Sequence, residues 1–391
     1  MRRLQLHTAG ESHGPGLTAL LEGLPMGLRV DPARIDAELA RRQEGYGRGG
    51  RMKIERDRVR ITGGLRRGLT LGGPLALWIE NLDYPNWEAS MHPEPRRGEK
   101  APKPVTQPRP GHADLAGVLK TGTDDIRNVI ERASARETAA RVAAGAVCRL
   151  LLEALDVRLF SHVLAIGGVQ SQADYGDLAA LATAAAANDL HVADPEAYAR
   201  MLRTIKAVWQ DGDTLGGVAE VVVTGLAPGL GHYVHWERRL DARLGAAILS
   251  IPAVKGMEIG PAFENARMRG SRAMDPILPA KGGPLRYRRP TNRMGGLEGG
   301  MTTGEPLLVR GAMKPISTLM QPLASVDIAS GQPVKALRER SDCTAVAAMG
   351  VVMEAMVALV LADAVLEEFR SATLADLKAA WRLYRRQQAR R

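Results

Sequence analysis

The segment RNVIERASARETAARVAAGAV, residues 127–147, predicts a central core helix. Ser134 and Glu137 have the spacing of a capping box, in which each side chain satisfies a backbone N–H of the first turn. Apolar residues then recur at helical spacing up to Leu151. We therefore expect the helix to begin near Ser134.

Arg127, Arg132 and Arg136 crowd the N-terminal end of this helix. A helix N-terminus carries partial positive charge and unsatisfied N–H donors, so cations are unfavourable there unless an anion is also present. Forked guanidinium groups beside the Ser134 hydroxyl therefore favour an anion-binding site. A solvated basic turn in front of a core helix is the alternative.

Composition narrows the class of protein. The chain has 391 residues and a net charge of +10, which permits a large core and either nucleic acid or small acidic molecules as partners. Aromatic residues make up 4% of the chain, which disfavours a nucleic-acid binder because such proteins usually need aromatic stacking platforms. Cys148 and Cys343 lie in apolar surroundings and are expected as buried thiols of a reducing cytosol.

Targeting signals are not apparent in the sequence. Residues 1–10 lack the apolar stretch of a signal peptide. The apolar stretch at 345–365 is interrupted by Glu354 and Asp363, so it predicts a buried core helix rather than a membrane span. A cytoplasmic protein without a membrane partner is therefore expected.

The sequence shows no clean linker, which favours one intertwined domain over residues 1–391, and its periodicity predicts both strands and helices. Strands are expected at residues 3–8, 17–21, 59–62, 69–79, 157–169 and 218–224, and helices at 31–43, 177–187, 194–209, 240–250 and 344–369. The remaining segments are a mobile Pro-rich loop at 83–110, short strands at most within 255–312, and a basic tail at 378–391. Thr-Leu-Gly-Gly occurs before an apolar run at both 70–73 and 214–217, which hints at two similar halves.

The sequence GESHG at residues 10–14 fits G-x-S-x-G, the nucleophile turn of α/β-hydrolases. That turn follows a central strand and opens a helix, whereas barely one strand precedes residue 10 and Gly-Pro-Gly follows His13. A serine hydrolase with Ser12 as nucleophile is therefore disfavoured but left open. A Gly-rich turn that presents His13 to a site is the preferred interpretation.

The sequence GYGRGG at residues 45–50 fits G-x-G-x-x-G, but it follows a predicted helix and opens a strand. The dinucleotide-binding motif needs the reverse order, so that interpretation fails and leaves Arg42 and Arg48 as basic groups at a turn. KPIST at 314–318 offers a Lys and two hydroxyls for a phosphate. RERSD at 338–342 places Asp342 among arginines, with helix capping by Ser341 or Asp342 as the alternative. No spacing of metal ligands is evident.

Several of these motifs occur together in one order. GESHG, GYGRG, RPGHADL, SARETAARVAAGA, AVKGMEIG, GGLEGGMTTG, KPISTL and RSDCTAV resemble the chorismate synthase family over nearly the whole chain. The resemblance implies an α+β fold, a β-α-β sandwich with a helical layer between two antiparallel sheets and two pseudo-repeated halves. It also implies that the protein is a carbon–oxygen lyase, which catalyses the last step of the shikimate pathway and forms chorismate. The reaction is the 1,4-anti elimination of phosphate from 5-enolpyruvylshikimate 3-phosphate.

The resemblance further implies reduced FMN as cofactor, a homotetramer, and roles for individual residues. NADPH is expected only indirectly or as reductant, with a separate flavin reductase as a further partner. The catalytic residues would be His13, His112 and Asp342. The substrate-binding residues would be Arg48, Arg109, Ser134, Arg136 and Arg340. The cofactor-binding residues would be Arg42, Arg48, Arg132, Ala133, Ser134, Pro252, Ala253, Gly299, Lys314, Pro315, Ile316, Ser317, Thr318 and Arg340.

One position departs from the family pattern. Pro252 stands where the family often has Asn or Gln. A side-chain hydrogen bond to flavin is lost there, so Pro252 is expected to be a weak contact.

Overall fold

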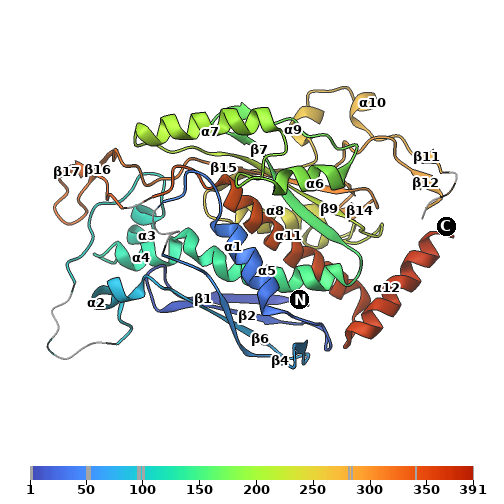
Figure 1. The fold of residues 1–391 in the computed structure, drawn as a ribbon, viewed down its shortest axis with the longest axis horizontal. Helices are drawn as coiled ribbons and strands as arrows, with labels where there is room; N and C mark the ends of the chain where they lie inside the picture. The colour runs from blue at the N-terminus through green and yellow to red at the C-terminus, as the bar shows by residue number, and fades with distance from the viewer. Residues whose placement is uncertain are drawn as a thin grey trace.

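A computed structural model describes residues 3–49, 54–94, 98, 102–280, 282, 285–339 and 341–390. Two antiparallel sheets enclose a layer of helices (Figure 1). The first sheet has the order β1 (Gln5–Ala9), β2 (Gly16–Glu22), β6 (Leu75–Glu80) and β3 (Val59–Gly63). The second sheet has the order β10 (Val254–Ile259), β15 (Leu307–Met313), β9 (Gly217–Thr224), β7 (Arg158–Ile166) and β8 (Val169–Gln170).

The helical layer contains α1 (Pro32–Gln43), α5 (Thr138–Glu153), α8 (Leu240–Leu249) and α11 (Val346–Phe369). Helix α5 packs against β2 and β6, α11 packs against β7 and β9, and the two helices pack against each other. Their backbones approach closely at Gly145, where an added Cβ would lie 2.4 Å from the Cβ of Ala355. The predicted β-α-β sandwich is therefore confirmed.

The repeated Thr-Leu-Gly-Gly segments occupy equivalent places in the two halves. The first leads into β6 and the second into β9, and each of these strands lies between two neighbours in its own sheet. Thr70 donates a hydrogen bond to the carbonyl of Pro25 (2.6 Å) and Thr214 donates one to the carbonyl of Ile316 (2.8 Å). The same local sequence thus anchors the start of an inner strand twice.

The start of the central helix differs from the predicted capping box. Ser134 caps a short 3₁₀ turn, η3 (Ala135–Glu137), by accepting a hydrogen bond from the backbone N–H of Arg136 at 3.4 Å. Glu137 does not reach back to Ser134, because its carboxylate instead accepts hydrogen bonds from Arg141 (2.9 Å) and Thr8 (3.2 Å). A separate short helix, α4 (Arg127–Ala133), precedes the turn. The predicted capping box is therefore wrong for Glu137, whose carboxylate does not accept the backbone N–H of Ser134.

Helix α11 is long and apolar enough to cross a membrane, but 89% of its most apolar 18-residue window is buried inside the protein. Its two buried carboxylates are each paired, Glu354 with Arg41 at 2.7 Å and Asp363 with Arg243 at 2.5 Å. The expected buried core helix is confirmed. Cys148 and Cys343 are also buried and free, as expected.

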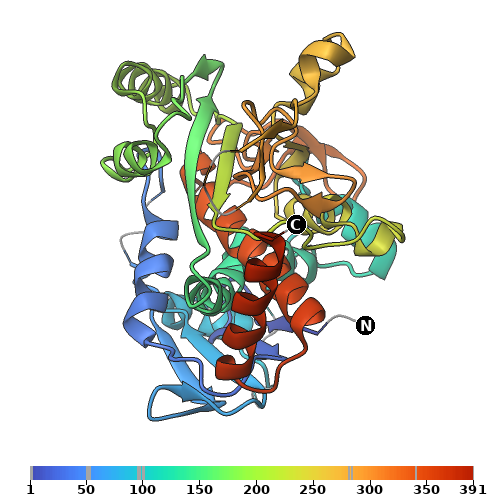
Figure 2. The same cartoon turned by 90° about the vertical axis from the view of Figure 1, so that its right-hand side faces the viewer.

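Three segments differ from the sequence-based expectation. The loop at 83–110 contains two short helices, η2 (Tyr84–Asn86) and α2 (Glu88–Met91), while 95–97 and 99–101 lie outside the described residues. Strand β15 (Leu307–Met313) begins within 255–312, where only short strands were expected, and is a seven-residue inner strand. The basic segment 378–391 forms most of α12 (Leu374–Gln388), which crosses one end of the sandwich with Trp381 buried (Figure 2).

The smaller elements complete the description. The helices are α3 (Asp114–Thr121), α6 (Leu178–Ala186), α7 (Pro195–Gln210), η4 (Trp236–Arg238), α9 (Ala262–Asn265) and α10 (Gly270–Ala273). The strand pairs are β4 (Leu65–Arg66) with β5 (Leu69–Thr70), β11 (Leu278–Pro279) with β12 (Tyr287–Arg288), β13 (Leu297–Glu298) with β14 (Met301–Thr302), and β16 (Ala324–Val326) with β17 (Pro333–Lys335).

Candidate active site

A cavity of about 1030 Å³ lies where α5 and α11 begin. Its walls come from the β1–β2 turn, the segment after α1, the turn before α3, the segment between α4 and α5, the segment before β10, the segment after β15, and the first turns of α11. The volume lies at the upper end of the range for small-molecule sites, which is about 300–1,000 Å³. The sandwich therefore brings segments from the whole chain to one place.

Most of the predicted site residues line this cavity. They are His13, Arg42, Arg48, Arg109, His112, Ala133, Ser134, Arg136, Pro252, Ala253, Lys314, Ile316, Ser317, Thr318 and Asp342. Among the predicted residues that the structure describes, Arg132, Gly299 and Pro315 do not line it. Arg340 lies outside the described residues.

Arg132 and Gly299 have other surroundings. The exposed Arg132 guanidinium donates to the carbonyls of Thr8 (2.9 Å) and Gly10 (3.2 Å), beside the turn that carries His13. Gly299 forms the tight turn between β13 and β14 with a positive φ of 60°. Neither position points to a ligand contact in this cavity.

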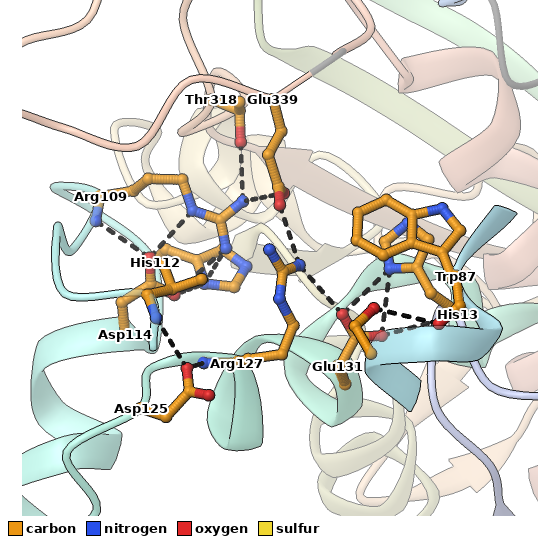
Figure 3. A network of polar contacts seen from close by, with 12 residues as sticks. His13, Trp87, Arg109, His112, Asp114, Asp125, Arg127, Glu131, Thr318 and Glu339 are labelled. Carbon is orange, nitrogen blue, oxygen red and sulfur yellow. Dashed lines mark hydrogen bonds and ion pairs between the residues drawn. The ribbon is translucent and has the colours of Figure 1, made fainter. Parts of the chain in front are cut away.

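The His112 cluster consists of Arg109, His112 and Asp114 (Figure 3). The Nδ1 atom of His112 contacts the Asp114 carboxylate, and Arg109 donates to the same carboxylate from Nε at 2.9 Å. Burial raises the pKa of Asp114, but the hydrogen bonds from His112 and Arg109 outweigh it and hold that pKa well below its ordinary value. Asp114 therefore stays ionised and fixes the ring of His112.

The His13 cluster consists of His13, Trp87, Arg127 and Glu131 (Figure 3). Glu131 accepts hydrogen bonds from the backbone N–H of His13 at 2.8 Å and from Arg127 at 3.1 Å, and it lies 3.0 Å from the Nδ1 of His13. The rings of His13 and Trp87 stack with centroids 3.9 Å apart. Burial raises the pKa of Glu131, but the contacts with His13 and Arg127 outweigh it and lower that pKa.

Glu339 connects the two clusters. Its carboxylate accepts a hydrogen bond from Arg127 at 2.9 Å and one from Arg109 at 3.5 Å (Figure 3). Arg109 also donates to the Thr318 hydroxyl at 3.0 Å. Both histidines thus belong to one continuous polar network at the cavity wall.

Asp342 forms an ion pair with Arg48, outside the two histidine clusters. Its carboxylate lies 2.9 Å from Nε of Arg48 and accepts a hydrogen bond from the backbone N–H of Gly49 at 2.6 Å. Helix α11 begins only at Val346, with Ala345 as its capping residue. Helix capping by Asp342 is therefore excluded, and the carboxylate instead ties the Gly-rich turn to the cavity.

Arg42 and Arg136 share one buried carboxylate. Arg136 donates to both oxygens of Asp57 at 2.7 Å, and Arg42 lies 3.6 Å from the same group. Burial lowers the pKa of Arg42 to about 10, although Asp57 opposes the shift. These two guanidinium groups thus have an internal carboxylate partner, Asp57, which the sequence analysis did not identify.

One part of the cavity wall is less polar. Its apolar members are Ile251, Pro252, Ala253, Met313, Ile316, Met349 and Val352. Beside them the Lys314 ammonium donates to the Ser317 hydroxyl at 2.7 Å, and burial, with a contribution from Lys255, lowers the pKa of Lys314. Ala253 has a positive φ of 69°, an unusual backbone conformation for a residue with a side chain. An apolar wall next to a cation and hydroxyls fits a flat ring system that carries a phosphate.

Sequence analysis missed four residues of the network as site residues. Asp114, Trp87, Glu131 and Glu339 received no role, although Asp114 lies two positions after His112 and Glu131 lies four positions after Arg127. Those short spacings were usable signals for a turn contact and for a helical ion pair. No local spacing could have predicted that Trp87 stacks on His13.

The hydrolase interpretation finds no support in this geometry. The GESHG turn joins β1 to β2 in an antiparallel pair, so it does not form the strand–turn–helix of a hydrolase nucleophile. No group of three or more His, Cys, Asp or Glu side chains that could hold a metal ion occurs within the described part of the chain.

Comparisons with known proteins agree with one another. The family model described as "Chorismate synthase" matches residues 4–366. A protein named chorismate synthase from Parafrankia sp. (strain EAN1pec) is 54% identical over 368 residues, which cover 93% of each chain. One of the same name from Rubrobacter xylanophilus is 53% identical over 384 residues, which cover 98% of this chain and 97% of the relative. A structure titled "Crystal Structure of Chorismate Synthase" superposes with a TM-score of 0.81 at 37% identity and covers 100% of both chains.

Proposed function

This chain belongs to the chorismate synthase family, and we propose that the cavity described above is where the family reaction takes place. The reaction is a carbon–oxygen lyase step of the shikimate pathway, the 1,4-anti elimination of phosphate from 5-enolpyruvylshikimate 3-phosphate to give chorismate. Two His–carboxylate pairs on one cavity wall are the observation that carries the proposal. They hold two proton-transfer groups in fixed orientations beside a cluster of cations.

The substrate is strongly anionic. One phosphate and two carboxylates give it about four negative charges near neutral pH. We propose that Arg48, Arg109 and Arg136, with the Ser134 hydroxyl, bind these groups, since all four residues line the cavity. Arg340 is proposed for the same role on the strength of the family resemblance alone.

Reduced FMN is the proposed cofactor. Lys314, Ser317 and Thr318 would hold its phosphate, while Ala253, Ile316 and the neighbouring apolar wall would face its ring. Pro252 lines the same wall and offers no side-chain hydrogen bond. Arg42 and Ala133, which also line the cavity, are proposed contacts, and Arg132, Gly299 and Pro315 remain proposals by resemblance only. When bound, the reduced flavin supplies the electron density that stabilises the electron-poor ring left by phosphate departure.

Three residues are proposed to move protons. His13 donates a proton to the departing phosphate oxygen, which makes phosphate a better leaving group. His112, fixed by Asp114, acts as a second donor at the same wall. Asp342 accepts the ring proton that the elimination releases, so that phosphate and one proton leave together and no net oxidation occurs.

The proposals on assembly, localisation and the reductant are based on family resemblance. We propose a cytoplasmic homotetramer whose flavin is reduced by a separate enzyme, with NADPH only as the indirect reductant. The segment 83–110 is proposed to order further over the cavity when ligands bind. Limited proteolysis with and without FMN and substrate tests this, and equal cleavage rates would contradict it.

The test of the main proposal is an anaerobic assay of phosphate release from 5-enolpyruvylshikimate 3-phosphate with dithionite-reduced FMN. We expect stoichiometric chorismate and phosphate, and no reaction with oxidised FMN. Phosphate release without chorismate would instead indicate a phosphatase. Covalent labelling of Ser12 by a serine-reactive phosphonate would revive the hydrolase alternative.

A further inference from the structure

The carboxylate of Glu339 occupies a position that has the chemistry of an anion-binding subsite. It lies between two guanidinium groups, 2.9 Å from Arg127 and 3.5 Å from Arg109. Arg109 is 6% exposed and Arg127 16%, so both cations are largely withdrawn from water. Two converging guanidinium groups at such positions bind phosphate or carboxylate well.

Glu339 is the replaceable carboxylate of this network. Asp114 is fully buried and accepts from the backbone and side chain of Arg109 as well as contacting His112. Glu131 is 3% exposed and accepts two hydrogen bonds besides its contact with the His13 ring. Glu339 is 22% exposed, lines the cavity, and has the two arginines as its side-chain partners.

The balance of arginines and carboxylates also points to Glu339. Two guanidinium groups face three carboxylates among the described residues. Withdrawal of Glu339 removes the third carboxylate from these two guanidinium groups, which favours the approach of an anionic group of the ligand.

We propose that Glu339 is a built-in substitute anion, which holds the Arg109–Arg127 subsite until an anionic group of the ligand displaces it. The subsite binds a phosphate or a carboxylate group, and Arg127 becomes one of the residues that contact this group. Return of Glu339 to the two arginines then helps to expel inorganic phosphate after the reaction. This proposal rests on the proposed function for the identity of the substrate, but not for the existence of the subsite.

The test measures binding of inorganic phosphate to the full chain by calorimetry, without flavin or substrate. Glu339→Gln keeps the shape and a hydrogen-bond acceptor but removes the charge, so we expect phosphate to bind roughly tenfold more tightly. Glu339→Asp keeps the charge and should stay within about twofold of the wild type. Glu298→Gln is the matched control, because Glu298 also pairs with an arginine (Arg289, 2.7 Å) but lies outside the cavity lining.

A double variant locates the effect. Adding Arg127→Gln to Glu339→Gln should remove the gain in phosphate affinity, because one of the two cations of the subsite is then lost. The proposal is overturned if Glu339→Gln, with an unchanged circular dichroism spectrum, binds phosphate no more tightly than the wild type. An equal gain in Glu298→Gln would also overturn it, since the cause would then be net charge. These outcomes are independent of turnover, whose absence in the wild type would count against the proposed function instead.

Discussion

The His13 and His112 clusters are built from the same groups by opposite means. Each places a histidine Nδ1 and an arginine on one buried carboxylate. The His112 cluster comes from a single turn, since His112 and Asp114 are two residues apart. His13 and Glu131 are 118 residues apart, and Trp87 comes from a third segment. The difference shows that one histidine is oriented by its local sequence and the other by the contact of the β1–β2 turn with α4.

Removing the histidines should have the largest effect. His13→Ala should slow chorismate formation by about 10²–10⁴-fold, the usual contribution of one general acid, and His112→Ala by a similar factor. Ser12→Ala should keep most of the activity, because the proposed mechanism gives the Ser12 hydroxyl no proton to transfer. Steady-state rates under anaerobic conditions measure all three. If Ser12→Ala were inactive and His13→Ala active, the assignment of this turn would be wrong.

The carboxylates should then separate the two clusters by stability. Asp114→Asn should cost about 3–5 kcal/mol of unfolding free energy, because it leaves the buried Arg109 charge without its main partner. Glu131→Gln should cost less, about 1–3 kcal/mol, because Arg127 keeps Glu339. Urea denaturation of both variants measures the difference. Equal losses of unfolding free energy would show that Asp114, which is near its histidine in sequence, and Glu131, which is far from its histidine, contribute equally to stability.

The pH dependence of stability should follow the same carboxylates. The pKa values of Asp114 and Glu131 are lower in the folded protein than their ordinary values, so protonation favours the unfolded chain. Their contribution is complete above about pH 5 and is lost as the pH falls below about 4. Asp114→Asn should therefore flatten the profile of unfolding free energy between these values and below. A profile parallel to that of the wild type would contradict this, and Glu298→Gln is the control.

The smallest effect is expected at Trp87, which comes from a different segment of the chain than His13 and Glu131. Trp87→Ala should lower turnover about three- to tenfold, since an aromatic stacking contact contributes about 0.5–1.5 kcal/mol. Trp87→Phe should restore most of that loss, because a second ring can stack on His13. Trp236→Ala, at a tryptophan 73% exposed and outside the cavity lining, is the control. No change in Trp87→Ala would mean that Glu131 alone orients His13.

The contrast between contacts within one segment and contacts between remote segments also explains how much of the fold the sequence could predict. Helix α1 follows its Asp-Pro start, and Asp31 accepts the backbone N–H of Ala33 at 3.0 Å as such a start requires. Strand β15 was missed because a Gly-rich and Pro-rich stretch hides its apolar run, and its partners β9 and β10 lie far from it in sequence. The sandwich itself was expected only through family resemblance, since no periodicity tells which helix lies between which sheets.

The site residues also divide into those that the sequence could predict and those that it could not. Gly-rich turns marked His13 and Arg48, family resemblance marked His112, and all three residues line the cavity. Their carboxylate partners were not predicted, because an Asp or Glu on a helix looks the same in sequence whether it faces water or a buried arginine. Asp57 and Glu339 are the clearest examples, because each pairs with an arginine that the sequence analysis considered without a carboxylate partner.

The position of α11 between the sheets also determines the order in which the protein can fold during synthesis. Helix α5 ends at Glu153 and α11 begins at Val346, so the ribosome adds 192 residues between them. At the usual rate of about 5–20 residues per second, the face of α5 around Gly145 waits roughly 10 to 40 seconds for its partner. The core therefore closes late, and a nascent chain that is released before Phe369 lacks the middle of its sandwich rather than an outer appendage.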